Sequence, residues 1–198
     1  YSLGQGNYTE KDISESARAF TGWTTKYNND TKRSEVQFIP ANFDPTSKTI
    51  FEGTPWVRTG AFNSQDIVNL TFDVHPQTPR FYAKAIYKFL VKQEPSEAVL
   101  STLAKLLKDS NYDVKPLLRK ILLSKEFFSP ASRRNSVKTP VEFALGVVKN
   151  AYLPVYDIRD LDTPIRNMGQ TILNPPSVKG WDDDRYWLND QWMMERSS

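Results

Sequence analysis

The chain has 198 residues, and its 26 basic and 23 acidic side chains leave a net charge of only +3. Its 39% hydrophobic content is ordinary for a folded globular domain. It has no cysteine and one histidine, which excludes disulfides, thiol catalysis and the usual zinc ligand sets. No apolar run approaches the length of a membrane span, so we expect no membrane-spanning helix.

The first predicted elements are a helix and a hairpin. Thr9-Glu10-Lys11-Asp12 has the form of a capping box, with aspartate in place of the usual glutamate, and predicts a helix that ends near Gly22. Two extended runs, Trp23 to Tyr27 and Glu35 to Ile39, then flank a polar turn and predict a β-hairpin. An isolated pair of strands is only marginally stable in water, so we expect this hairpin to lean on the helices.

All later predicted elements except a short strand near Thr49 are helices, and most begin at recognisable caps such as the complete box Thr139-Pro140-Val141-Glu142. Their approximate ranges are 65–73, 79–92, 96–109, 114–128, 140–152, 164–173 and 190–194. We therefore expect a mainly α fold, a packed multi-helix domain with one small β-hairpin excursion near residues 23–51. We expect residues 1–198 to form a single domain.

The helix that we expect to begin at Thr78-Pro79 is the central element of the chain. Threonine supplies an N-cap acceptor, and proline loses nothing by lacking an N–H group at the first helical position. Its predicted buried side consists of Phe81, Tyr82, Ala85, Ile86 and Phe89, with Leu90 flanking them.

A row of cations lies largely opposite that apolar side. Arg80, Lys84, Lys88 and Lys92 fall four residues apart, and no acidic residue lies between Pro79 and Lys92. The row belongs to a basic block, because residues 76–138 carry 13 basic and 5 acidic side chains. Such a row is usually a solvated surface; the alternative is that these four residues bind an anionic partner.

The single histidine allows one catalytic hypothesis. His75 directly precedes this helix, and Asp73 lies two residues before it, so the two side chains could act as a base and its orienting carboxylate. The alternative is a linker histidine that hydrogen-bonds a helix end. A pair of carboxylates distant in sequence would also permit hydrolase chemistry, because such pairs are found in space.

Clusters of aspartates are the only candidate metal ligands. Asp182, Asp183 and Asp184 form one run, and a second group lies at residues 157–162. Neither follows the twelve-residue calcium loop, because the central glycine and the final glutamate are missing. We favour solvated acidic loops and expect no cofactor.

Several stretches in order resemble one bacterial family, the domain-of-unknown-function 1800 family. The matching stretches are Leu3-Gly4, Tyr8-Thr9-Glu10, Ala17-Arg18-Ala19-Phe20-Thr21-Gly22-Trp23, Phe43-Asp44-Pro45, His75-Pro76 with Thr78, Phe81 and Lys84, Ser124-Lys125-Glu126-Phe127, Lys138 to Phe143, Gly169-Gln170, Pro175 to Trp181, and Trp187-Leu188-Asn189. One departure is the run Asp182 to Asp184, where relatives tend to be rich in glycine.

The resemblance implies the C-terminal portion of a longer, exported bacterial protein, periplasmic or extracellular, and brings no catalytic residues. With the basic block, it leads us to expect a non-catalytic binding or structural domain. The expected partner is another protein, an envelope polymer or the N-terminal half of the same protein, and nucleic acid is a weaker candidate. The alternative is a hydrolase that uses His75 or a carboxylate pair.

Overall fold

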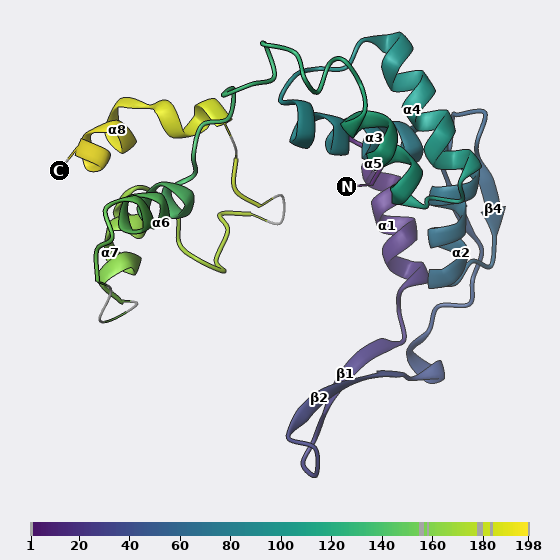
Figure 1. Cartoon of the computed structure of the whole chain (residues 1–198). Coiled ribbons are helices and arrows are strands. Elements are labelled where there is room, and N and C mark those ends of the chain that lie inside the picture. The colour runs from purple at the N-terminus through teal and green to yellow at the C-terminus, as the bar shows by residue number, and fades with distance from the viewer. Residues whose placement is uncertain (1, 155–156, 158, 178–179, 183, 198) are drawn as a thin grey trace. The chain divides into compact units, whose positions relative to one another are not determined.

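The computed structural model describes residues 2–154, 157, 159–177, 180–182 and 184–197. It is mainly α-helical with two small two-stranded antiparallel sheets (Figure 1), which confirms the predicted fold class. Contacts between residues group the chain into two compact units, residues 1–127 and 128–198, and we describe each by itself. The expectation of a single domain stays a prediction. In the described part of the chain, no helix combines the length and the apolar character needed to cross a membrane.

Helix α1 (Glu10–Ala19) opens the first unit with the predicted capping box. The Thr9 backbone N–H donates to the Asp12 carboxylate at 2.7 Å, and the Asp12 N–H donates back to the Thr9 hydroxyl at 3.2 Å. The other Asp12 oxygen accepts the Phe51 N–H at 2.6 Å. One buried carboxylate therefore starts the helix and also fixes the segment that follows β3 (Lys48–Ile50) against it.

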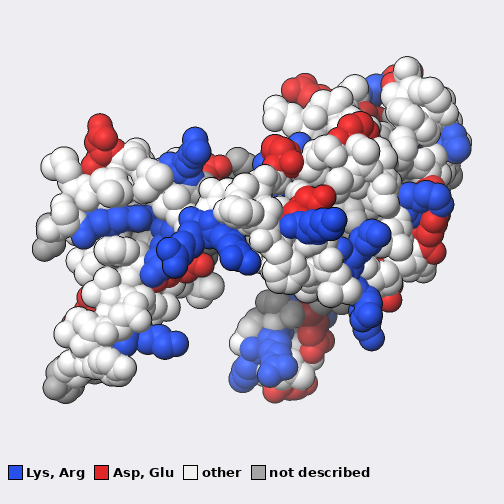
Figure 2. Space-filling view, turned by 45° about the horizontal axis from the view of Figure 1, so that its top comes forward, with Lys and Arg blue, Asp and Glu red and all other residues white. Residues whose placement is uncertain are grey.

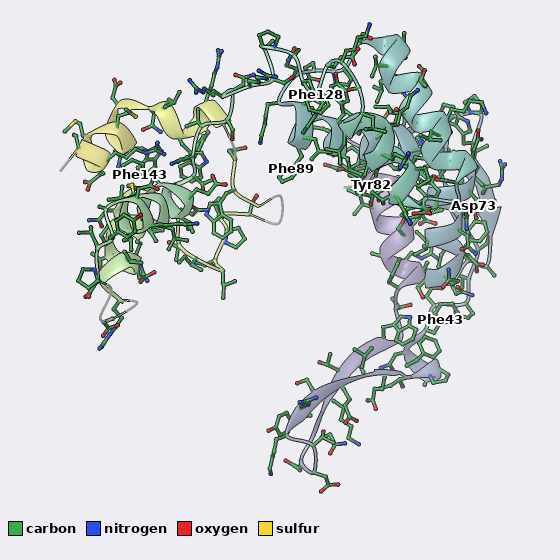
Figure 3. The ribbon with its side chains drawn as sticks, viewed as in Figure 1. Phe43, Asp73, Tyr82, Phe89, Phe128 and Phe143 are labelled. Atoms are coloured by element: carbon green, nitrogen blue, oxygen red, sulfur yellow. The ribbon has the colours of Figure 1, made fainter. Side chains whose placement is uncertain are left out.

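The predicted hairpin is present as β1 (Trp23–Asn28) and β2 (Arg33–Phe38), and Figure 1 shows it extending from the end of α1. Aromatic packing holds the end of the hairpin that is nearest to α1. Gly22 has φ +88°, and a Cβ there would lie 2.6 Å from the Phe38 ring, so only glycine fits. Phe43, labelled in Figure 3, packs against Phe38 in a tilted arrangement, with ring centroids 5.8 Å apart, where the hairpin meets the helices. A second pair of strands, β3 and β4 (Arg58–Gly60), lies beside α1.

Helices α2 (Ser64–Asn69), α3 (Gln77–Val91), α4 (Glu97–Asp109) and α5 (Val114–Leu122) complete the first unit. A π-helical turn, Leu70–Val74, joins α2 to the segment before α3. The last three helices pack around a common apolar core. Its buried residues are Ala83, Tyr87, Val91, Leu100, Leu103, Ala104, Leu107, Leu117 and Ile121.

The start and the buried side of α3 differ from the prediction. The N-cap is Pro76, and the Thr78 hydroxyl donates to the Thr71 carbonyl instead of capping the helix. The most buried line of α3 runs through Ala83, Tyr87 and Val91, whereas Phe89 is 71% exposed. Ala83 is 0% exposed in the core that α3 shares with α4 and α5, and the spacing of large apolar residues does not reveal this.

The second unit contains α6 (Pro140–Asn150), α7 (Arg159–Asn167), a 3-10 turn at Asp184–Leu188, and α8 (Asp190–Ser197). The capping box of Thr139 and Glu142 is confirmed. The predicted start of α7 at Thr163-Pro164 is wrong. The helix begins at Arg159, whose N–H donates to Asp157, and Pro164 lies inside it.

Candidate functional site

His75 is packed in the interior. Its ring is 2% exposed and lies between Phe51 and Trp56, with ring centroids 4.7 and 5.0 Å away. Its Nδ1 accepts the backbone N–H of Gln77 at 3.2 Å, so the histidine holds the first turn of α3. Burial lowers the pKa of His75, and the weaker effect of Asp12 opposes that shift.

This geometry does not bring His75 and Asp73 together as a catalytic pair. No hydrogen bond joins the two side chains among the described residues, although the Asp73 carbonyl accepts one from Lys108 at 3.0 Å. His75 and Asp73 do line the same cavity of about 370 Å³, together with the cations Arg80, Lys105 and Lys108. A neutral imidazole with Nδ1 engaged by the backbone is the arrangement expected of a structural histidine.

The row on α3 has acidic partners that lie beyond the helix in sequence. Arg80 binds both oxygens of Glu97, at 2.7 and 2.8 Å. Lys84 and Lys88 share Glu94, at 2.9 and 2.6 Å. These contacts lower the pKa of Glu94, chiefly through hydrogen bonds from Lys88 and Lys84. Arg80, Lys84 and Lys88 are therefore paired with carboxylates of the same chain.

The fourth cation of the row, Lys92, ends α3 in the left-handed conformation, and its ammonium group lies 5.2 Å from the centre of the Phe89 ring. Figure 2 shows basic and acidic side chains side by side at several places on the surface. The row is thus a mixed ionic surface: no acidic residue lies between Pro79 and Lys92, but Arg80, Lys84 and Lys88 pair with glutamates that follow the helix.

Helix α5 carries cations of a different kind, which sequence reasoning did not single out. Lys115, Arg119 and Lys120 are exposed, and none of them forms an ion pair with a described residue. Like the α3 row, they have no acidic residue three or four positions away. No local signal in the sequence therefore separates the paired row from the unpaired one.

A groove of about 760 Å³ runs beside these α5 cations. Its α4 side includes Val99, Leu103 and Leu106, and its α5 side includes Arg119 and Lys120. The floor belongs to the apolar core, because Leu103 and Ile121 are both buried there. The arrangement is an apolar channel with basic side chains along one edge.

The aspartates that were candidate metal ligands lie partly outside the described residues. In the described part of the chain, no group of three or more candidate ligands comes together. Asp157 pairs with Arg159 and Asp162 with Arg166, which leaves these carboxylates engaged with arginines. Asp183 and the side chain of Asp184 lie outside the described residues, and Asp182 has a partner of its own.

Comparison with protein-family models gives one decisive match. The model described as "Protein of unknown function (DUF1800)" matches residues 1–198. The chain belongs to the DUF1800 family. Searches of curated proteins and of solved structures found no match.

In this DUF1800 chain, several residues on which the resemblance rests hold the fold together. Arg18 donates to the Asp44 carboxylate at 2.8 Å, and the Asp44 N–H donates to the Thr21 hydroxyl at 2.8 Å, which joins two of the matching stretches. In the second unit, a Cβ on Gly169 would lie 2.6 Å from the Trp192 ring, and Gln170 accepts the Val141 N–H. These family residues therefore have structural roles within their units.

Proposed function

We propose that this DUF1800 chain is a non-catalytic interaction domain that binds an acidic partner protein through the basic block of residues 76–138. The observation that carries the proposal is the unpaired charge on α5, because Lys115, Arg119 and Lys120 have no acidic partner among the described residues. Charges left without internal partners on a rigid helix can pair with an opposite surface and steer its approach.

The location of the contact follows from the same comparison of charges. The α3 row keeps its cations engaged with Glu94 and Glu97, so a partner would have to displace these pairs. The α5 cations need no such displacement. We therefore place the primary contact on α5, while a role for Arg80, Lys84, Lys88 and Lys92 stays a prediction that the same experiment tests.

Capture of partners on two charge-reversed variants tests the proposal. The full chain and two variants, Lys115→Glu/Arg119→Glu/Lys120→Glu and Lys84→Glu/Lys88→Glu, are immobilised and exposed to the native envelope fraction. We expect an acidic protein that the wild type and the α3 variant retain and the α5 variant loses. Retention unaffected by either reversal would exclude the basic block as the contact surface.

Export is a separate proposal and rests on the family resemblance alone. We propose that the full-length protein acts in the periplasm or outside the cell. Fractionation of cells that express the tagged full-length gene tests this, and recovery in the cytoplasmic fraction would contradict it.

The hydrolase alternative gains no support from the surroundings of His75, which is buried between two aromatic rings. The hydrolase alternative can be tested directly. Hydrolysis of a generic ester or glycoside substrate that disappears in a folded His75→Gln variant would replace the binding proposal with an enzymatic one.

A further inference from the structure

The groove between α4 and α5 has the dimensions of a docking site for a short helix. Its α4 wall extends from Ala98 to Leu106, which at 1.5 Å per residue corresponds to about 12 Å, or roughly two helical turns. Along this wall, Val99, Leu103 and Leu106 repeat at helical spacing. A partner helix with apolar residues at the same spacing could lie along this wall.

The floor of the groove presents an unused polar group. Tyr87 is 5% exposed and lines the groove, yet its hydroxyl forms no hydrogen bond with any described residue. Burial raises the pKa of Tyr87, and nearby Glu126 raises it further, so the hydroxyl stays protonated and can donate. A hydroxyl without a protein partner at this position is available to water or to a ligand.

The edge of the groove selects the charge of the ligand. Arg119 and Lys120 line it, are exposed, and have no acidic partner among the described residues. The lining contains one carboxylate, that of Glu126, which the two cations outnumber. A ligand that places carboxylates beside the α5 edge and apolar side chains over Leu103 and Ile121 matches both features.

We propose that this groove binds an acidic amphipathic α-helix of a partner protein. The proposal rests on the function proposed above and specifies its surface and its ligand. A helix fits better than a strand because both walls are helices and offer no free strand edge for pairing. A flexible anionic polymer would satisfy Arg119 and Lys120 but would leave the apolar floor uncovered.

A synthetic probe tests the proposal with the full chain. The probe is a helical peptide of about 14 residues with leucines at positions i, i+3, i+4 and i+7 and glutamates on the flanking positions. Two matched peptides replace the glutamates by glutamine or the leucines by serine. Binding is measured by fluorescence anisotropy at two salt concentrations.

Four new variants, with the α3 reversal Lys84→Glu/Lys88→Glu, locate the contact. Arg119→Glu/Lys120→Glu reverses the edge, and Thr102→Trp fills the groove from an exposed position on its wall. Ser101→Trp is the matched control, because Ser101 lines the cavity beside His75 and does not line this groove. Tyr87→Phe removes only the unused hydroxyl.

Replacing the glutamates of the peptide by glutamine should weaken its binding at least about tenfold, and so should Arg119→Glu/Lys120→Glu and Thr102→Trp in the protein. The variants Ser101→Trp and Lys84→Glu/Lys88→Glu should keep the affinity within about twofold of the wild type. Tyr87→Phe should weaken binding about threefold without lowering the stability of the free protein, because no internal hydrogen bond is lost.

Absence of peptide binding would overturn the groove proposal, as would equal binding of the serine peptide or equal losses from the α3 and α5 reversals. The two assays distinguish an error in the groove proposal from an error in the proposed interaction function. If the envelope capture still yields an acidic partner that depends on Lys84 and Lys88, the interaction domain stands and only its surface changes. If neither assay shows charge-dependent binding, both proposals fall.

Discussion

Helices α3 and α5 belong to the same basic block, yet their cations are in different situations. On α3, Arg80, Lys84 and Lys88 are tied to Glu94 and Glu97. On α5, Arg119 and Lys120 have no such partners among the described residues. The count of positive charges is therefore a poor guide to a binding face. What matters is whether the fold has already paired each charge.

The largest expected effect comes from weakening the packing of α5 against the core. Leu117 is 0% exposed and packs in the core that α5 shares with α3 and α4. Leu117→Ala should lower the free energy of unfolding by about 3 kcal/mol, because it leaves a cavity in a packed core. Urea denaturation measures the loss, and peptide binding should weaken with it. Leu122→Ala on the same helix is the control, since Leu122 is 38% exposed and its loss should cost less than half as much.

The buried residues of these helices could be predicted from the sequence only in part. The apolar spacing after the aspartate cap predicts that Leu117, Leu118, Ile121 and Leu122 face the core, and of these Leu117 and Ile121 are buried whereas Leu122 is 38% exposed. The same reasoning failed on α3, where apolar residues surround much of the helix and the packing is centred on a small alanine. Periodicity identifies the buried side of a helix when polar residues flank its apolar side. It does not identify the buried side when aromatic residues occur on several sides of the helix.

The same limit applies to the candidate site. Caps, turns and the hairpin depend on neighbours in sequence, so the capping boxes at Thr9 and Thr139 are predictable, and both residues cap their helices. The pairs that neutralise α3 depend on how the chain turns back after Lys92. The groove depends on how α4 meets α5. Neither arrangement is encoded at a fixed spacing, so the sequence could not show that Arg80, Lys84 and Lys88 are paired while Arg119 and Lys120 have no acidic partner among the described residues.

Acidification separates the contribution of His75 from that of the α3 ion pairs. The folded-state pKa of His75 is lowered by burial, so the unfolded chain binds a proton at higher pH than the folded chain. The stability that this histidine contributes is present above its ordinary pKa of about 6.5 and is lost as the pH falls toward the folded-state value. Unfolding by urea at pH 7.5 and 5.5 should show the decrease.

The His75→Gln variant should remove most of that pH dependence between 7.5 and 5.5. The α3 pairs behave differently, because their hydrogen bonds lower the pKa of Glu94 and of Glu97 below ordinary values. Their contribution is present above the ordinary glutamate pKa and is lost only as the pH falls further, through the folded-state values. A His75→Gln protein that keeps the full decrease above pH 5.5 would show that another group causes it.

The smallest expected effect on stability gives the most direct test of the comparison. Glu94→Gln releases Lys84 and Lys88 from their shared partner and makes α3 resemble α5. Because all three side chains are about half exposed, the change should cost less than about 1 kcal/mol of stability. Retention of the variant on an immobilised polyglutamate resin should nevertheless increase, and the gain should shrink at high salt.

Asp30→Asn is the matched control, because it changes the net charge by the same amount on the exposed turn of the hairpin. If pairing distinguishes the two helices, Glu94→Gln should increase retention more than this control does. Equal increases in the two variants would mean that retention follows net charge alone. In that case the unpaired state of Arg119 and Lys120 would no longer single out α5, and the surface of the interaction domain would have to be sought by apolar contact instead of by charge.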